Sequence, residues 1–388
     1  MREDTAVARI RGRLRPYATV LKVILVLVAV DLFVRGPFFD RYIMPGLVYK
    51  YALLRERTLG AHPSILFDAL DKLPVPGVRI AFVGDSTMQA FESPDVTTVP
   101  YMVEKALRGA LGRADIESID TSVSGLYIGD GALVVDKLVG AKVDVIVYGI
   151  LLRAFARDLN TQWVTRVRSE MGLRDLSRMT AVGGFPWLVR NVGVESLVGG
   201  VVHNTWATYA YRTLLGRWLT KIAPPLQAVL QPPPIARQAA IAPRAPNASG
   251  FDLTREEFGY PNPSWEALDL LGRLCREYAA WRCLVFSGPI NPEHRVTAAE
   301  PGFYDEFRER MRIVAGRNGI VWRDYTDAMT AEDFLPSRFG ETRRDAIHLN
   351  VEGRQKLAQR LAQPLSEIVA RVVQERNGRG APALAIED

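Results

Sequence analysis

Short apolar runs alternate with stretches of helical periodicity over most of this chain. Runs rich in β-branched and aromatic residues predict strands at 78–83, 115–120, 143–148, 283–287 and 320–322. Apolar residues recur at helical spacing over 101–111, 131–139, 264–280, 304–318 and 351–374. Strands that alternate with helices predict a parallel sheet covered on both faces, a three-layer α/β/α fold. The ligands of such sheets bind beyond the carboxyl ends of the strands.

The N-terminal part of the chain departs from this alternation. Residues 17–34 form an apolar stretch of 18 residues, about the shortest that spans a bilayer as a helix. Arginines precede this stretch, which favours a cytoplasmic N-terminus and an outside location for everything after residue 35. We therefore expect a retained transmembrane helix over 17–35, which Pro37 and Pro45 would end. A cleaved secretory signal and a buried helix of the folded domain are the alternatives.

A segment from 151 to 260 interrupts the strand–helix alternation. Ten basic and four acidic residues fall within 151–222, with four of the seven tryptophans, Trp163, Trp187, Trp206 and Trp218. Basic residues mixed with tryptophan suit a helical insertion that lies at a membrane interface or binds an anionic polymer. The alternative is a helical cap whose aromatic residues are core and whose arginines are solvated. A proline-rich stretch follows, which predicts an extended surface segment.

Composition and charge exclude several classes of protein. The chain has 388 residues, of which 48% are hydrophobic and two are cysteines, so neither a disordered chain nor a cysteine-rich scaffold fits. The net charge is +6; the first 22 residues carry +4 and residues 151–222 carry +6, so the remainder is acidic. The positive charge therefore marks an anchor and one basic segment, and we expect no nucleic-acid partner. Cys275 and Cys283 form either a disulfide in an oxidising compartment or two buried thiols.

The residues best placed for chemistry lie near the two ends of the predicted sheet region. Gly84-Asp85-Ser86-Thr87 follows the 78–83 strand directly, where a serine projects its hydroxyl at the carboxyl edge of the sheet. Asp345 lies three residues before His348, after the last predicted strand, and can orient the imidazole. The pattern predicts a relay from Ser86 to His348 to Asp345. Taken singly, the serine turn and the Asp-x-x-His pair are also ordinary turn or cap features, and no His/Cys cluster completes a metal site.

The order of these blocks resembles the SGNH/GDSL hydrolase superfamily. The similar segments are 82–86 (Phe-Val-Gly-Asp-Ser), 120–125 (Asp-Thr-Ser-Val-Ser-Gly) and 345–350 (Asp-Ala-Ile-His-Leu-Asn), the last followed by Gly353. The resemblance implies that Ser86 is the nucleophile, His348 the base and Asp345 its orienting acid. It also implies oxyanion donors in the backbone amides of Ser86 and Gly125, and no cofactor.

The chain departs from the superfamily pattern after its third predicted strand. The superfamily commonly has a Gly-x-Asn-Asp block there, whereas this chain has Leu151 in place of the asparagine, so one oxyanion donor is missing. Loss of one such donor costs about 10²–10³ in rate. Arg153 is a conjectural substitute donor, and Asp85, Asn291 and His294 are candidate substrate-binding residues.

A narrower resemblance covers the segment 287–294, the helix after it and the Asp-x-x-His ending. These are similar to the D-alanine-transfer protein of teichoic-acid modification and to the polysaccharide O-acetylation proteins of Gram-negative envelopes. The resemblance implies a serine-dependent acyltransferase or esterase for O-acyl groups, chiefly acetyl, of an extracytoplasmic polysaccharide or envelope polymer. It further implies a single-pass protein of the bacterial inner membrane with a periplasmic catalytic domain, and a membrane-bound O-acyltransferase as partner. A plain carbohydrate O-acetylesterase and a non-catalytic scaffold that binds glycan are the alternatives.

Together these features predict the domain organisation. We expect an SGNH-type α/β domain in two parts, interrupted by the helical insertion and preceded by the transmembrane helix. The predicted order is a basic cytoplasmic tail (1–16), the anchor (17–35), a juxtamembrane segment (36–75), the first part of the α/β domain (76–150), the insertion (151–260), the second part (261–375) and a flexible tail (376–388).

Overall fold

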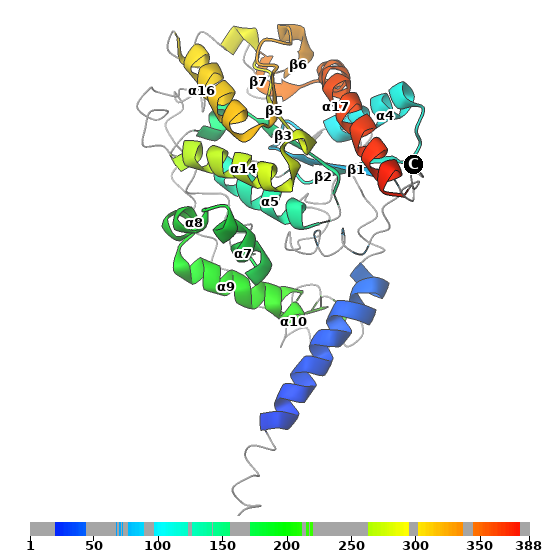
Figure 1. The fold of residues 1–388 in the computed structure, drawn as a ribbon, viewed down its shortest axis with the longest axis vertical. Coiled ribbons are helices and arrows are strands. Elements are labelled where there is room, and N and C mark those ends of the chain that lie inside the picture. The colour runs from blue at the N-terminus through cyan, green and yellow to red at the C-terminus, as the bar shows by residue number, and fades with distance from the viewer. Residues whose placement is uncertain are drawn as a thin grey trace, which may run out of the picture.

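A five-stranded parallel sheet forms the centre of the molecule (Figure 1). The computed structural model describes residues 20–43, 77–88, 97–122, 126–141, 143–155, 171–211, 263–294, 302–336 and 344–380, with a few single residues within 67–72 and 215–219. The strand order is β2-β1-β3-β4-β5. The strands are β1 (Val78–Val83), β2 (Ile116–Asp120), β3 (Val145–Ile150), β4 (Cys283–Ser287) and β5 (Val321–Asp324). All residues of β1, β2 and β4 are buried, as expected for strands covered on both faces.

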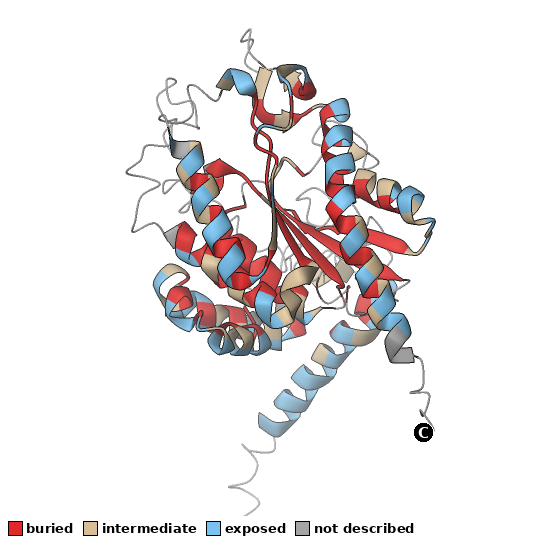
Figure 2. Ribbon diagram, turned by 45° about the horizontal axis from the view of Figure 1, so that its top comes forward, coloured by how far each residue is buried: buried red, intermediate tan, exposed pale blue. Residues whose placement is uncertain are grey.

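Helices cover both faces of the sheet, and the buried residues lie between the layers (Figure 2). Ile80 and Phe82 of β1 belong to the core shared with α4 (Val99–Leu111) and α17 (Val351–Gly380). Ala81 and Val83 belong to the core shared with α5 (Ile128–Gly140), α14 (Pro263–Ala279) and α16 (Phe303–Asn318). The alternation follows from the period of two along a strand. The predicted α/β fold with a parallel sheet is therefore confirmed.

The predicted strands and helices of the sheet region are found within three residues of their predicted starts. Local signals explain this agreement for α4. The Thr98 side chain accepts a hydrogen bond from the Tyr101 N–H at 3.4 Å, and Pro100 lies in the first turn. Gly112, with φ 62°, ends the helix in the left-handed conformation that glycine adopts without strain.

The sequence did not predict the hairpin that carries the acid–base residues. Strands β6 (Phe334–Pro336) and β7 (Arg344–Leu349) form a separate antiparallel pair, next to the short helix η8 (Ala331–Asp333). Asp345 and His348 follow the last strand of the parallel sheet, as expected, but they lie on a further strand, β7, that the sequence did not predict. The extended conformation of β7 depends on its pairing with β6, which has three residues, and the hydrophobic pattern of the segment does not indicate it.

Within the predicted insertion, the structure describes a group of short helices beneath α5 and α14 (Figure 1). They are α7 (Leu173–Ala181), α8 (Phe185–Asn191), α9 (Val194–Thr205) and α10 (Ala207–Ala210), preceded by η4 (Leu152–Phe155). Arg178 of α7 binds both carboxylate oxygens of Asp136 on α5, at 3.0 and 3.2 Å. Trp187 is buried, whereas Trp206 is 38% exposed. Trp163 and the proline-rich stretch lie outside the described residues.

The N-terminal helix projects from the domain (Figure 1). It is α-helical over residues 20–33 and continues as η1 (Val34–Ile43), a π-helix that contains Pro37. The helical run therefore continues through Pro37, contrary to expectation, and Pro45 lies outside the described residues. Phe38 and Phe39 are buried and pack against Trp218 and Tyr211, which holds the segment to the domain. Among the described residues, we find no helix with both the length and the apolarity of a membrane span. Residues 17–19 of the predicted anchor are not among those described.

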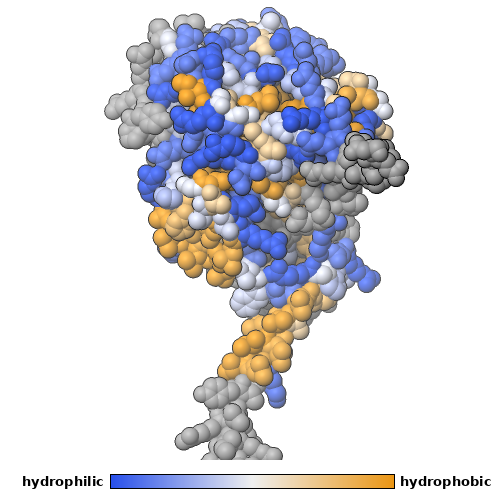
Figure 3. Space-filling model, in the orientation of Figure 1, coloured by the Kyte–Doolittle hydropathy of each residue, from blue (hydrophilic) through white to orange (hydrophobic). Residues whose placement is uncertain are grey.

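Apolar side chains are exposed along this N-terminal helix (Figure 3). The exposed large ones are Val20, Leu21, Val23, Ile24, Leu25, Val26, Leu27, Val28, Val30, Leu32 and Phe33. A helix with apolar residues on every side is normally covered by something other than water.

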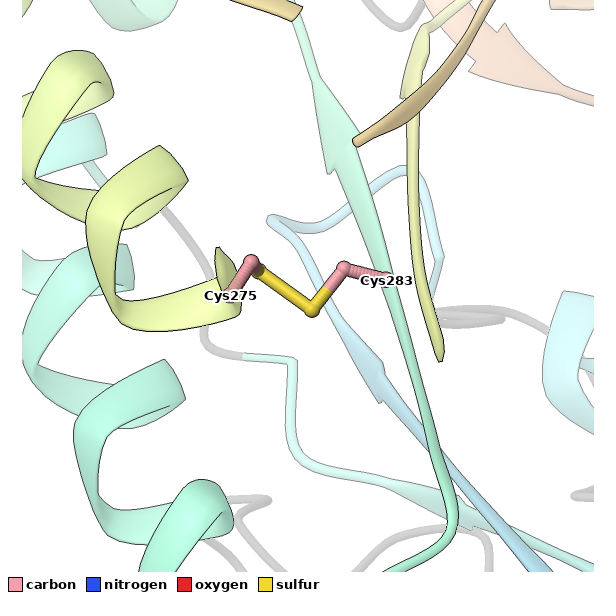
Figure 4. Close-up of a disulfide and its surroundings, with 2 residues drawn as sticks. All are labelled: Cys275 and Cys283. Atoms are coloured by element: carbon pink, nitrogen blue, oxygen red, sulfur yellow. A yellow bond between two sulfur atoms is a disulfide. The ribbon is translucent and has the colours of Figure 1, made fainter. Parts of the chain in front are cut away.

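The two cysteines form a disulfide between α14 and β4 (Figure 4). Their Cα atoms are 5.9 Å apart, and both residues are buried. The helix η7 (Ala280–Arg282) completes the connection between them. The bond fixes the end of α14 to the start of the strand that follows it.

Candidate active site

Ser86 lies on a tight turn at the carboxyl end of β1. Asp85 Oδ1 accepts hydrogen bonds from the Thr87 N–H at 2.9 Å and the Thr87 hydroxyl at 2.7 Å, which closes the turn. A Cβ at Gly84 would lie 2.6 Å from Met88 Cγ, so a larger residue here would displace the Met88 side chain. Since β1 lies between β2 and β3, the turn sits where the strand order reverses, the usual place for a site in an open α/β sheet.

The structure brings Ser86, His348 and Asp345 together in the order that the sequence predicts. Ser86 Oγ is 2.9 Å from His348 Nε2. On the other side of the ring, His348 Nδ1 is 3.0 Å from each carboxylate oxygen of Asp345. Nδ1 therefore carries the proton that it donates to Asp345, which leaves Nε2 free to accept the proton of the serine hydroxyl.

The environment of Asp345 keeps its carboxylate ionised. Burial on its own raises the pKa of Asp345, but the hydrogen bond and charge of His348 and two backbone N–H groups outweigh it and lower the pKa to about 2. The two N–H groups belong to Ile347 and His348 and lie 2.9 and 2.8 Å from Oδ1. A fixed negative charge beside Nδ1 stabilises the imidazolium that forms when His348 takes a proton.

Asn291, which the sequence suggests as a substrate-binding residue, contacts the backbone of β7. Its side chain is fully buried; Nδ2 donates to the Asp345 carbonyl oxygen at 3.0 Å, and its N–H donates to the Ala346 carbonyl at 2.9 Å. His294 Nε2 lies 2.7 Å from the carbonyl oxygen of Arg344, also on β7. The loop after β4 thus positions the strand that carries the acid and the base.

Of the expected oxyanion donors, the structure describes only the backbone N–H of Ser86. Among the described residues, no hydrogen-bond acceptor is found for the Ser86 N–H. Gly125 and the side chain of Arg153 lie outside the described part of the chain. Leu151 is 4% exposed and packs with Ala346 and Ile347, so its position supplies packing for β7 and no side-chain donor.

Sequence reasoning missed the residues that support β7. Glu293 Oε2 accepts the Arg344 N–H at 3.3 Å, and Arg344 Nη1 donates to the Phe334 carbonyl at 2.9 Å. Asn350 Oδ1 caps α17 by accepting the Gly353 N–H at 2.9 Å. Only the cap had a sequence signal, an asparagine directly before a helical pattern. In the described part of the chain, no group of three or more His, Cys, Asp or Glu residues could hold a metal ion.

Comparison with known proteins gives weak likenesses only. The sequence matches no family profile and no curated protein. Among solved structures, an α/β hydrolase from the metagenome of Lake Arreo, Spain, has a TM-score of 0.36 at 12% identity, covering 77% of this chain and 98% of that one. An acetylxylan esterase from Geobacillus stearothermophilus has a TM-score of 0.37 at 9% identity, covering 76% and 96%. At these scores the likenesses carry no argument, and we base the function on the geometry of the site.

Proposed function

We propose that this chain is a serine-dependent esterase or acyltransferase of the SGNH/GDSL type, acting on O-acyl groups. The observation that carries the proposal is the continuous hydrogen-bonded relay of Ser86, His348 and Asp345 at the carboxyl edge of the sheet. A serine hydroxyl is a weak nucleophile until an adjacent base accepts its proton, and this arrangement supplies the base with its orienting carboxylate.

The chemistry follows from the two nitrogens of His348. Ser86 Oγ attacks the carbonyl carbon of the ester while its proton passes to Nε2, and the oxyanion that forms faces the Ser86 N–H. The ester bond breaks, the leaving alcohol takes the proton from Nε2, and the acyl group remains on Ser86. Water or a sugar hydroxyl then attacks the acyl-enzyme, again giving its proton to Nε2. The acid or the new ester leaves, and the Ser86 hydroxyl recovers the proton.

The finer part of the proposal concerns substrate and place. We place the enzyme on the bacterial inner membrane, anchored by residues 17–35, with its site in the periplasm and an envelope polysaccharide as the acyl donor or acceptor. The exposed apolar surface of residues 20–33 supports an anchor. Acetyl is the acyl group that we propose, with a membrane-bound O-acyltransferase as partner.

An ester probe tests the chemistry. The full chain should release the chromophore of a chromogenic acetyl ester and carry an acetyl group on Ser86, and Ser86→Ala should abolish both. Ser366→Ala is the matched control, because Ser366 Oγ only donates to Ala362 O within α17. Full acetylation of the Ser86→Ala variant would exclude Ser86 as the nucleophile. Addition of an oligosaccharide acceptor separates transfer from hydrolysis, since only a transferase forms the acetylated sugar.

Leu151 favours one second candidate, a non-catalytic scaffold of a membrane acyltransferase. It occupies the position of an expected oxyanion donor with an apolar side chain. Polymer acylation in cells decides between the two. Full acylation in cells that carry only the Ser86→Ala or His348→Ala variant would support the scaffold, and loss of acylation with normal protein levels would support the enzyme.

A further inference from the structure

An apolar stripe runs along the outer face of α9. Val194, Val198 and Val202 recur at intervals of four residues and are 60%, 59% and 48% exposed, whereas Leu197 faces the core and is 5% exposed. Leu173 at the start of α7, Phe185 at the start of α8 and Trp206 at the end of α9 are exposed as well. Figure 3 shows an apolar patch over the region of α8 and α9. We call these six residues the α9 surface. An apolar patch of this kind on a folded domain marks an interaction site.

The end of α9 lies beside the exposed apolar helix at the N-terminus. Asp31 of that helix accepts the Thr208 N–H at 2.8 Å, at the start of α10. Arg35 donates to Asp31 at 2.8 Å and also contacts the Thr205 carbonyl at the end of α9. The end of α9 and the start of α10 are therefore held to the N-terminal helix.

A pocket with charged lining lies between the ends of α5 and α9, the start of α7 and the base of the N-terminal helix. Its volume is about 380 Å³, and its charged lining residues are Arg35, Lys137, Arg174, Arg178 and Asp175. Asp175 pairs with Lys137 at 2.9 Å and with Arg178 at 2.5 Å, while Arg174 is exposed. Leu173, a member of the α9 surface, also lines the pocket. Arg178 also binds Asp136 and Arg35 also binds Asp31, so three carboxylates partner these cations. The exposed Arg174 leaves the pocket with a net positive charge next to apolar side chains.

We infer that the α9 surface and this pocket rest on an anionic lipid bilayer, as a second membrane contact beside the anchor. The inference rests on the anchor of the proposed function. A bilayer fits better than a protein partner because it accepts valine, phenylalanine and tryptophan side chains into its interface and provides anionic headgroups for the arginines. It would also cover the neighbouring apolar helix, which a partner seated on α9 alone would leave exposed.

This contact orients the catalytic residues away from the lipid. Lys137 and Gly140, at the end of α5, line the pocket and lie one helix length from the carboxyl edge where α5 begins. Strand β7, which carries Asp345 and His348, lies at the opposite end of the molecule from the N-terminal helix (Figure 1). The site therefore faces a substrate in the aqueous phase rather than one embedded in the bilayer.

Lipid quenching of a site-specific fluorophore tests the inference. The full chain is reconstituted in phosphatidylcholine vesicles with and without phosphatidylglycerol, after labelling of single introduced cysteines in the Val198→Cys, Val26→Cys and Ile313→Cys variants. The native cysteines are joined in a disulfide and do not compete for the label. Ile313 is the matched control, an apolar residue on α16 that is 48% exposed. Brominated lipids should quench the labels at 26 and 198, and phosphatidylglycerol should increase quenching at 198, while the label at 313 stays unquenched.

The three labels separate the inference from the anchor. Quenching at 26 without quenching at 198 would overturn the second contact and leave the anchor standing. Absence of quenching at 26 would overturn the anchor, and quenching at 198 would then still support a peripheral contact. The label at 198 could also become less accessible to a water-soluble quencher as the protein concentration rises in lipid-free detergent. That result would assign the α9 surface to contact with a second copy of the chain and would overturn the inference.

Discussion

Replacement of Asp345 by asparagine isolates the electrostatic part of the relay. The amide is almost the same size as the carboxylate, so it preserves packing in β7 and can still accept the backbone N–H groups that lie 2.8 and 2.9 Å from Oδ1. It removes the negative charge 3.0 Å from His348 Nδ1 and replaces one of the two acceptors of Nδ1, Oδ2, with an N–H donor. His348 then loses its charge partner and one of the two acceptors that fix its tautomer.

The size of the effect follows from the geometry. Opposite charges about 4 Å apart interact by about 4 kcal/mol at an effective dielectric constant of 20. The two side chains are 28% and 22% exposed, so solvent screens part of this interaction. Because each 1.36 kcal/mol is tenfold in rate, we expect Asp345→Asn to lower kcat by roughly 10²–10³ with little change in KM.

The assay is turnover of a chromogenic acetyl ester by the full chain. Asp324→Asn is the control, because Asp324 is also a carboxylate at a strand end, bound by Arg308 at 2.6 Å and by the Thr326 N–H at 3.0 Å. Its replacement should affect stability and leave kcat per folded molecule unchanged. An Asp345→Asn variant that kept more than a third of the parent kcat would refute the relay.

The lowered pKa of Asp345 also predicts that the free energy of unfolding depends on pH, and the Asp345→Asn variant tests this. The pKa of Asp345 is lowered to about 2 in the folded chain, below its ordinary value of 3.8, so the ionised group stabilises the fold. This contribution is fully present above pH 4 and is lost as the pH falls through about 2. The free energies of unfolding of parent and Asp345→Asn should therefore converge as the pH is lowered from 5 to 2. A difference that stays constant over this range would contradict the lowered pKa.

Three further predictions concern the support of the site and the fold. Asn291→Ala leaves the Asp345 carbonyl without its buried donor, so urea unfolding should show a loss of about 1–3 kcal/mol, and kcat should fall at unchanged KM; unchanged kcat would mean that Asn291 does not position Asp345. Replacement of Cys275 and Cys283 by serine should cost about 2–3 kcal/mol in urea unfolding, the value for a loop of this length, and a reducing agent should affect only the parent. Arg178→Met leaves the buried Asp136 carboxylate unpaired and should cost about 3–5 kcal/mol, with α7 becoming sensitive to proteases first; protection equal to that of the parent would show that the ion pair does not hold the insertion.

The predicted parts of the structure are those with local signals. The buried run of β1 and the glycine turn after it place Ser86 correctly, because strand, turn and nucleophile are adjacent in the chain. The short β7 has no comparable local signal, since its extended conformation depends on pairing with β6. The role of Asn291 also escaped prediction, because its partner lies 54 residues away and nothing in the sequence links the two.

The sequence also did not show which side chains of the insertion are buried. Composition suggested a basic, tryptophan-rich insertion but could not orient its side chains. In the structure Trp187 lies in the core while Trp206 and Val198 are exposed, a division that depends on how α8 and α9 pack against the domain. The sequence similarly identified Leu151 as a departure from the superfamily pattern, but not its contact with Ile347.

The insertion has a consequence for when the protein becomes active. Ser86 and His348 are 262 residues apart in sequence, and about 110 of these belong to the segment between β3 and α14. Because loop-closure entropy grows only logarithmically, the extra chain adds about 0.5 kcal/mol to bringing the two residues together. Contacts of such long range form late in folding. Esterase activity should therefore appear only once β7 and α17 have been synthesised and docked, which makes turnover a direct reporter of complete folding.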